Sequence, residues 1–193
     1  MMFKSRCTRN PLFPRLCTAC AVSVLVLLTA MPFWGQVARA IEVDIGRVPP
    51  VEVYFSPNNG TTEAIVREID QARSEIRIQA YSFTSAPIAQ ALLKAHKRGI
   101  KVEVILDKSQ KTQKYSSSTF LMNARIPTYI DARHAIAHNK IIIIDQLVVI
   151  TGSFNFTKAA EDKNAENLLI IRSKDLAKPY LQNWWRHRDH SAA

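Results

Sequence analysis

The order of apolar segments between residues 51 and 106 constrains the fold most strongly. Strand-like segments with a two-residue period alternate there with segments of helical periodicity. The strand-like segments are residues 51–55, 75–80 and 101–106, and the helical ones begin at Thr61 or Thr62 and at Ser85-Ala86-Pro87. A β-α-β-α-β order is typical of parallel strands with helices packed on both faces of the sheet. We therefore predict an α/β fold, an α/β/α sandwich around a mostly parallel or mixed sheet.

The second half of the chain continues this pattern. Residues 140–144 (KIIII) are apolar after Lys140, which indicates a strand buried on both faces. The remaining predicted elements are strands at residues 128–130, 148–151 and 167–171, a weak helix that ends near Asn123 and a closing helix at residues 175–188. On the closing helix, we expect Trp184 and Trp185 to pack in the core or at an interface, with stacking on bases as the alternative. Because no repeat or linker rich in Gly and Ser divides residues 41–193, we predict a single domain there.

The first 40 residues have the pattern of a secretory signal peptide. Basic residues precede an uncharged, mostly apolar stretch at residues 16–31, and Ala38-Arg39-Ala40 then places small residues where a signal peptidase reads them. The apolar stretch has about 16 residues, fewer than the roughly 20 that a membrane-spanning helix needs. We therefore predict cleavage after Ala40 and a periplasmic or secreted protein without stable membrane association. An uncleaved anchor is the alternative.

The cysteine and charge content of residues 41–193 limits the kinds of site and substrate that this part of the chain can have. All three cysteines lie in the first 40 residues, so the predicted mature chain has no disulfide and no cysteine-based metal site. It carries 21 basic and 16 acidic residues, and this balance of +5 suits a polyanionic substrate. Lys108, Lys111 and Lys114 precede an uncharged serine run. We predict that they contact nucleic acid, with a solvated loop as the alternative.

One constellation of polar residues carries the chemistry. The pattern H-x-K-x-x-x-x-D is followed by G-S-x-N-x-T and then by an acidic residue. Its members are His138, Lys140, Asp145, Gly152, Ser153, Asn155, Thr157 and Glu166. This string resembles the HKD motif region of the phospholipase D superfamily, and its spacing and length are similar to those of the small bacterial endonucleases with one motif per chain. The resemblance covers roughly residues 50–190 and implies a phospholipase D-like nuclease domain.

The residue types at the start of the motif suit phosphate chemistry in their own right. His138 and Lys140 lie two residues apart on a predicted strand, so their side chains point to the same face. The ammonium of Lys140 neutralises phosphate charge, and the imidazole of His138 can attack phosphorus or transfer a proton. Asp145 lies an odd number of residues away and therefore on the opposite face, which predicts a structural role instead of a catalytic one.

The second part of the motif supplies further phosphate-binding groups. Ser153 and Asn155 are also two residues apart, and their hydroxyl and amide groups can donate to phosphate oxygens. Gly152 would let the backbone approach a ligand closely. Glu166 is suited to hold one nitrogen of His138 and to stabilise the imidazolium. We therefore predict that His138, Lys140 and Glu166 are catalytic and that Lys140, Ser153 and Asn155 bind phosphate.

The resemblance also implies how the site is assembled. Enzymes of the superfamily use two histidines around one phosphorus atom: one attacks to give a phosphohistidine, and the other protonates the leaving oxygen. Because this chain has one such motif, the resemblance implies a homodimer that brings two motifs together. Lysines would replace metal ions, and we expect no metal or other cofactor in the reaction. His134 and His138 have the spacing of a helical metal pair, but the strand predicted after His138 argues against that site.

These observations lead to three hypotheses about function. The first is an exported, metal-independent phosphodiesterase that acts as a non-specific endonuclease on DNA, with RNA as an alternative substrate. The second is a phospholipase D that hydrolyses phosphatidyl lipids such as phosphatidylcholine, because its chemistry would be the same. The third is a protein that binds nucleic acid or lipid without turnover, and the intact motif argues against it.

Overall fold

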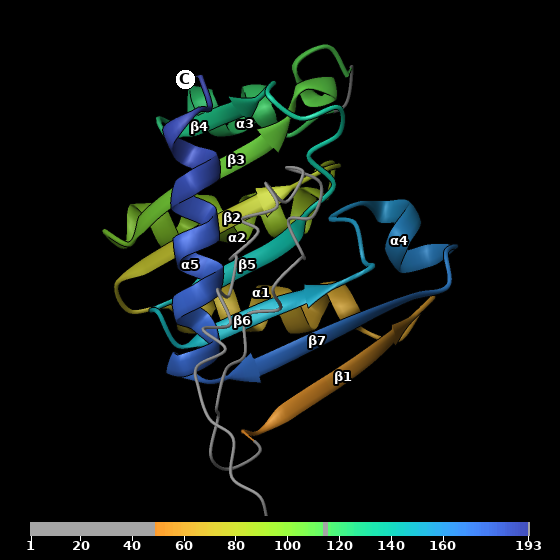
Figure 1. The fold of residues 1–193 in the computed structure, drawn as a ribbon. Coiled ribbons are helices and arrows are strands. Elements are labelled where there is room, and N and C mark those ends of the chain that lie inside the picture. The colour runs from red at the N-terminus through yellow and green to blue at the C-terminus, as the bar shows by residue number, and fades with distance from the viewer. Residues whose placement is uncertain (1–48, 114–115, 193) are drawn as a thin grey trace, which may run out of the picture. The chain divides into compact units, whose positions relative to one another are not determined.

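Seven strands form one mixed sheet in the order β1-β7-β6-β5-β2-β3-β4 (Figure 1). The computed structural model describes residues 49–113 and 116–192. The elements are β1 (Val51–Ser56), α1 (Thr61–Gln71), β2 (Glu75–Ala80), α2 (Ala86–Lys97), β3 (Lys101–Asp107), the 3-10 helix η1 (Lys108–Lys111), α3 (Ser118–Asn123), β4 (Thr128–Asp131), β5 (Lys140–Ile144), β6 (Val148–Gly152), α4 (Lys158–Asp162), β7 (Glu166–Arg172) and α5 (Lys174–Asp189). The predicted α/β class is confirmed.

The strand directions show that the sheet is mixed. β2, β3 and β4 are parallel neighbours, whereas β5, β6, β7 and β1 are joined by antiparallel pairing. β1 runs in the same direction as β2, but β7, β6 and β5 lie between them. A tight turn joins the antiparallel strands β5 and β6. Its central residues, Asp145 and Gln146, both have a φ of 53°, and two positive φ angles are typical of the turns that close a β-hairpin.

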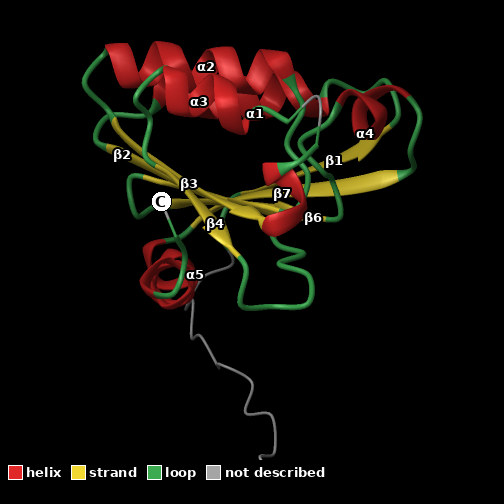
Figure 2. Cartoon of the chain, turned by 90° about the horizontal axis from the view of Figure 1, so that it is seen from above, coloured by secondary structure: helices red, strands yellow, loops and turns green. Residues whose placement is uncertain are grey.

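The four isoleucines of β5 are buried on both faces of the sheet, as their sequence predicts. Ile142 and Ile144 belong to the larger core cluster, and Ile141 and Ile143 belong to a smaller one that also includes Trp184 of α5. Figure 2 shows α1, α2 and α3 on one face of the sheet and α5 on the other. The expected α/β/α sandwich is therefore present, with unequal layers.

Several expectations about individual elements need correction. Gly60, with a φ of 73°, is the N-cap of α1, so neither Thr61 nor Thr62 caps this helix. The short elements η1 and α4 were not predicted, because four or five residues carry too little periodicity to distinguish a helix from a turn. The predicted signal peptide (residues 1–40) lies outside the described residues. Within the described ranges, no helix is both long and apolar enough to cross a membrane.

The topology gathers the motif at one edge of the sheet. Lys140 at the start of β5 is paired with Ala80 at the end of β2, and Gly152 at the end of β6 is paired with Leu168 near the start of β7. The carboxyl ends of β3 and β4 lie at the same edge, because both strands are parallel to β2. We call this side of the sheet the motif edge.

Candidate active site

A cleft of about 570 Å³ lies at the motif edge, between α5 and the strands β5 and β6. It is lined by His138, Asn139, Lys140, Ile141, Thr151, Gly152, Leu176, Pro179, Tyr180 and Asn183. The sheet contributes most of the polar groups, and α5 contributes an apolar wall. The structure thus places the first two residues of the motif in one cleft.

His138 and Lys140 meet in this cleft in an arrangement that differs from a regular strand. β5 begins at Lys140, so His138 lies in the loop that precedes the strand, where its side chain is exposed. Lys140 is buried, and its Nζ donates a hydrogen bond to the carbonyl oxygen of His138 at 2.9 Å. Strand alternation therefore does not explain why the two residues share a site, because His138 lies outside β5; this hydrogen bond holds them together.

Burial changes the electrostatics of Lys140. Desolvation lowers the pKa of its ammonium, and the negative charge of Glu166 partly opposes this effect. A positive charge that has lost most of its water interacts more strongly with an incoming phosphate than an exposed one would. Lys140 is therefore well placed to stabilise charge on a phosphoryl group.

Glu166 was predicted to contact His138, but its carboxylate contacts other residues. Its carboxylate accepts hydrogen bonds from Ser153 Oγ at 2.6 Å and from Asn164 Nδ2 at 3.0 Å. No hydrogen bond joins Glu166 to His138 among the described side chains. Ser153 Oγ in turn accepts a hydrogen bond from the backbone N–H of Asn167 at 3.1 Å, so its hydroxyl is already engaged. The predicted contact between Glu166 and His138 is thus not present in the single chain.

Gly152 and Asn155 have local surroundings that the motif did not reveal. A Cβ atom at Gly152 would collide with the backbone carbonyl of Asn167, so glycine is needed for the approach of β6 to β7. The close approach of a ligand at Gly152 stays a prediction. Asn155 Oδ1 is buried and has no hydrogen-bond partner. An unpartnered buried oxygen is costly, which makes Asn155 a candidate for a contact that forms only when substrate or another chain is present.

Asp145 lies at the far end of β5 from Lys140, in the turn after the strand. Its carboxylate accepts hydrogen bonds from the backbone N–H groups of Arg73, Ser74 and Glu75 at 2.8–3.0 Å and from Ser74 Oγ at 2.7 Å. Burial would raise the pKa of this carboxyl, but these hydrogen bonds outweigh burial and lower it. The contacts are those of a structural residue that fastens the β5–β6 turn to the start of β2.

Two of the three lysines predicted to contact nucleic acid can be placed. Lys108 and Lys111 are the first and last residues of η1, directly after β3 at the motif edge. Lys108 Nζ donates a hydrogen bond to the carbonyl oxygen of His134 at 3.1 Å. Lys114 lies outside the described residues. The motif edge therefore carries positive charge beyond that of Lys140.

Sequence reasoning missed Tyr81. Its ring centroid lies 4.6 Å from that of His138, and Lys140 Nζ lies 5.2 Å from the same tyrosine ring. The backbone N–H of Tyr81 also donates to the carbonyl oxygen of Asn139 at 2.9 Å. Tyr81 directly follows β2, and only the pairing of β2 with β5 brings it to the motif. No spacing in the sequence could have indicated this contact.

An imidazole and a buried ammonium in one cleft are groups suited to phosphoryl transfer. The family model described as "Cardiolipin synthase, PLD-like domain" matches residues 65–188. The chain therefore belongs to the phospholipase D superfamily, and its activity is that of a phosphodiesterase.

The comparisons with individual proteins agree on this family. A protein of Rickettsia felis named "Phospholipase D" is 49% identical over 134 residues, which are 69% of this chain and 67% of the relative. The crystal structure of Nuc from Salmonella typhimurium, described as a phospholipase D family member, is 39% identical with a TM-score of 0.71, and the match covers 74% of this chain and 96% of Nuc. NucT from Helicobacter pylori, at 24% identity and a TM-score of 0.66, shares the fold over 75% of this chain and 99% of NucT.

Proposed function

We propose that the chain is an exported endonuclease that hydrolyses DNA, with RNA as an alternative substrate, through a phosphohistidine on His138. The observation that carries the proposal is the pairing of exposed His138 with buried Lys140 in one open cleft. One group is free to reach a phosphorus atom, and the other is held where it can stabilise the charge on it. The reaction needs no metal ion at this site.

Nucleic acid is the favoured substrate because of charge and size. Residues 41–193 carry a balance of +5, and Lys108 and Lys111 extend the positive charge of the motif edge. The likeness to Nuc, a match that covers 96% of Nuc and 74% of this chain, supports a domain of similar size. The open cleft around His138 suits a long polyanion that lies across it.

The proposed reaction has two steps. In the first, a nitrogen of His138 attacks phosphorus, the bond from phosphorus to the leaving oxygen breaks, and a second histidine gives that oxygen a proton. In the second, this histidine takes a proton from water, the water oxygen attacks phosphorus, and the phosphorus–nitrogen bond breaks. One histidine must therefore start neutral and the other protonated, which predicts a bell-shaped dependence of rate on pH.

The second histidine has to come from another copy of the chain. His96, His187 and His190 have no lysine two residues on, and His138 is the one histidine among the described residues that line the cleft. A two-fold dimer through the motif edge would bring two copies of His138 and Lys140 to one phosphate. We therefore include a homodimer in the proposal.

Phospholipid hydrolysis is the second candidate, because two observations favour it. The Rickettsia felis relative carries the name "Phospholipase D", and the cleft has an apolar wall of Leu176, Pro179 and Tyr180 that could contact acyl chains. The phosphoryl chemistry would be the same for either substrate. Only an assay with both substrates separates the two candidates.

The test is an activity assay on plasmid DNA and on phosphatidylcholine vesicles, each with excess EDTA. We expect the wild-type chain and the control His96→Asn to cut the plasmid, and His138→Asn to lose at least about 10⁴-fold in rate while it still binds DNA. Cleavage of phosphatidylcholine alone would favour the second candidate. Loss of all activity on chelation in a chain that stays folded, restored by a divalent ion, or near-wild-type cleavage by His138→Asn would contradict the mechanism.

A further inference from the structure

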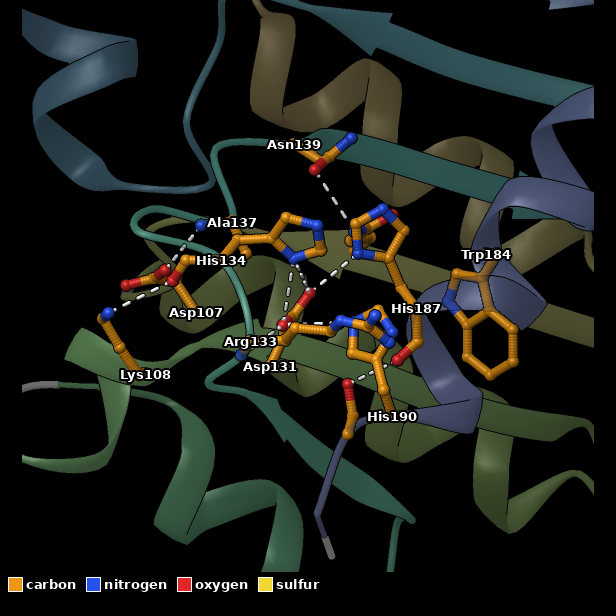
Figure 3. Close-up of polar contacts among 12 residues, drawn as sticks. Asp107, Lys108, Asp131, Arg133, His134, Ala137, Asn139, Trp184, His187 and His190 are labelled. Carbon is orange, nitrogen blue, oxygen red and sulfur yellow. Dashed lines mark hydrogen bonds and ion pairs between the residues drawn. The ribbon is translucent and has the colours of Figure 1, made fainter. Parts of the chain in front are cut away.

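Four side chains that the proposed reaction does not use converge beside the end of α5 (Figure 3). Asp131 is the last residue of β4, and His134 lies in the loop that leads to His138. His187 is in the last turn of α5, and His190 is the C-cap of this helix. One potential ligand atom from each of the four lies within 4.8 Å of all the others. We call this group the His₃Asp cluster.

The three imidazoles point at one carboxylate. His187 Nδ1 lies 2.7 Å from Asp131 Oδ2, His134 Nδ1 lies 3.1 Å from the same oxygen, and His190 Nε2 lies 3.3 Å from Asp131 Oδ1. Asp131 is fully buried, whereas the side chains of His187 and His190 are 14% and 18% exposed. The cluster is therefore largely enclosed, with His134 at its open side.

Hydrogen bonding alone leaves this arrangement incomplete. His190 Nε2 is buried and has no hydrogen-bond partner, although it lies close to Asp131. A neutral imidazole has one N–H donor and one lone pair, so each of the three rings can present a lone pair to a cation. A cation among the four groups would use a lone pair from each ring and the charge of the carboxylate at once. It would also give His190 Nε2 a partner.

We infer that Asp131, His134, His187 and His190 bind one divalent transition-metal ion, with Zn²⁺ as the favoured ion. Three imidazole nitrogens and one carboxylate oxygen are a donor set that Zn²⁺ accepts, with bonds of about 2.0–2.2 Å. In a tetrahedron with such bonds, neighbouring ligand atoms are about 3.3 Å apart, so ligand atoms that now lie up to 4.8 Å from one another have to move closer to close around the ion.

The site is structural, because all four tetrahedral positions are filled by protein. A catalytic zinc ion usually keeps one position open for water or substrate. The His₃Asp cluster also shares no residue with the lining of the cleft around His138. The inferred ion therefore takes no part in the proposed reaction, and the inference does not depend on that proposal.

The ion would fasten three parts of the chain that meet at the motif edge. The backbone groups of Ile130 and Ala192 already exchange hydrogen bonds at 2.7 and 3.1 Å, which hold the end of the chain to β4. The ion would add a link from α5 through Asp131 to the loop that carries His134 and, four residues later, His138. It would thereby stabilise α5 on the sheet and restrict the loop before the motif.

The experiment measures Zn²⁺ and Co²⁺ binding to the purified full chain after treatment with a chelator. We expect one tight site per chain and, with Co²⁺, visible bands of a tetrahedral site without thiolate charge-transfer bands. The absence of thiolate bands excludes binding by Cys7, Cys17 and Cys20, which are present in the full chain. Excess Zn²⁺ should raise the Tm by roughly 5–10 °C when its concentration is about a hundred times Kd.

Variants assign the site to these residues. His187→Gln and His134→Gln should each weaken binding at least tenfold and remove most of the increase in Tm, whereas the control His96→Gln should change neither. His134→Gln keeps the test valid if His187→Gln fails to fold, because His134 is 44% exposed and lies in a loop. Absence of a tight site in the wild-type chain, or equal binding by wild type and a folded His134→Gln variant, would overturn the inference.

Discussion

At the residue scale, Lys140 is the feature that most clearly separates this cleft from an ordinary surface hollow. Its ammonium is buried next to an exposed imidazole, and burial lowers its pKa. A buried charge without a catalytic or structural use is costly, and the hydrogen bond to the His138 carbonyl satisfies only one of its three donors. The two remaining donors are available to phosphate oxygens.

Replacement of Lys140 by an apolar residue of similar length tests this use. Lys140→Met should lower kcat by about 10²- to 10³-fold, because one preorganised donor to the phosphoryl group is lost while the packing is kept. Steady-state kinetics on the substrate found in the activity assay provide the measurement. The control Lys94→Met removes an exposed lysine of α2 and should leave kcat unchanged. A kcat of Lys140→Met within threefold of wild type would exclude this role.

The charge of Glu166 has a measurable consequence for the dependence of activity on pH. Burial lowers the pKa of Lys140, and the charge of Glu166 raises it. Glu166→Gln removes the opposing charge, so Lys140 should lose its proton at a lower pH than in the wild type. A further fall in kcat/KM, at a pH above the limb set by the protonated histidine, marks the loss of the Lys140 proton and should therefore move to lower pH. Glu63→Gln, at an exposed position of α1, should leave this fall in place, and an unmoved fall in Glu166→Gln would argue against the coupling.

At the scale of elements, Asp145 links the β5–β6 turn to the backbone before β2. Asp145→Asn should lower the free energy of unfolding by about 1–2 kcal/mol at neutral pH, because a charged acceptor of four hydrogen bonds is lost. The lowered pKa of Asp145 means that its contribution is present above the unfolded-state pKa of about 3.9 and is lost as pH falls through the folded-state value.

Urea unfolding at several pH values measures this effect. The difference between wild type and Asp145→Asn should be largest near neutral pH and should shrink on acidification below roughly pH 4. Asp70→Asn, at an exposed position of α1, should change stability little at any pH. A difference that stays constant from neutral to acidic pH would contradict the role given to the carboxylate.

The elements themselves were largely predictable, because their signals are local. Period-two segments and the KIIII run place β2, β3 and β5 within a residue of their observed bounds. The strand predicted at residues 140–144 already ends before Asp145, but the conformation of the turn was not predicted, because Gln146 is not of a residue type typical of a positive φ. Asp145 was expected to be structural because of strand alternation, whereas its observed contacts follow from that turn.

At the scale of the whole molecule, the residues that meet at the two sites come from distant parts of the chain. Tyr81 reaches His138 through the pairing of β2 with β5, and the His₃Asp cluster joins β4 to α5 across 56 residues. Spacing reveals partners only within one element or one turn. The motif could therefore be found in the sequence, while the neighbours of its residues and the second cluster required the fold.

The homodimer is the main claim at this scale, and mixed chains test it. Sedimentation should show that the active species is a dimer. Chains with His138→Ala mixed with chains with Lys140→Ala form heterodimers that hold one His138 and one Lys140. If two histidines and two lysines are all needed, little activity should return on mixing, whereas recovered activity would show that one His138 and one Lys140 from different chains suffice. An active monomer in sedimentation would rule out the shared site.

The covalent step at His138 is the central claim, and a trapped intermediate tests it most directly. Excess enzyme is mixed with a labelled phosphodiester and quenched in alkaline detergent, because phosphohistidine is labile to acid, and the labelled peptide is then located by mass spectrometry. We predict label on the peptide that contains His138, its loss in His138→Asn, and its decay as product appears. Product formation in a single turnover without label on His138, or label retained at another residue in His138→Asn, would contradict the account.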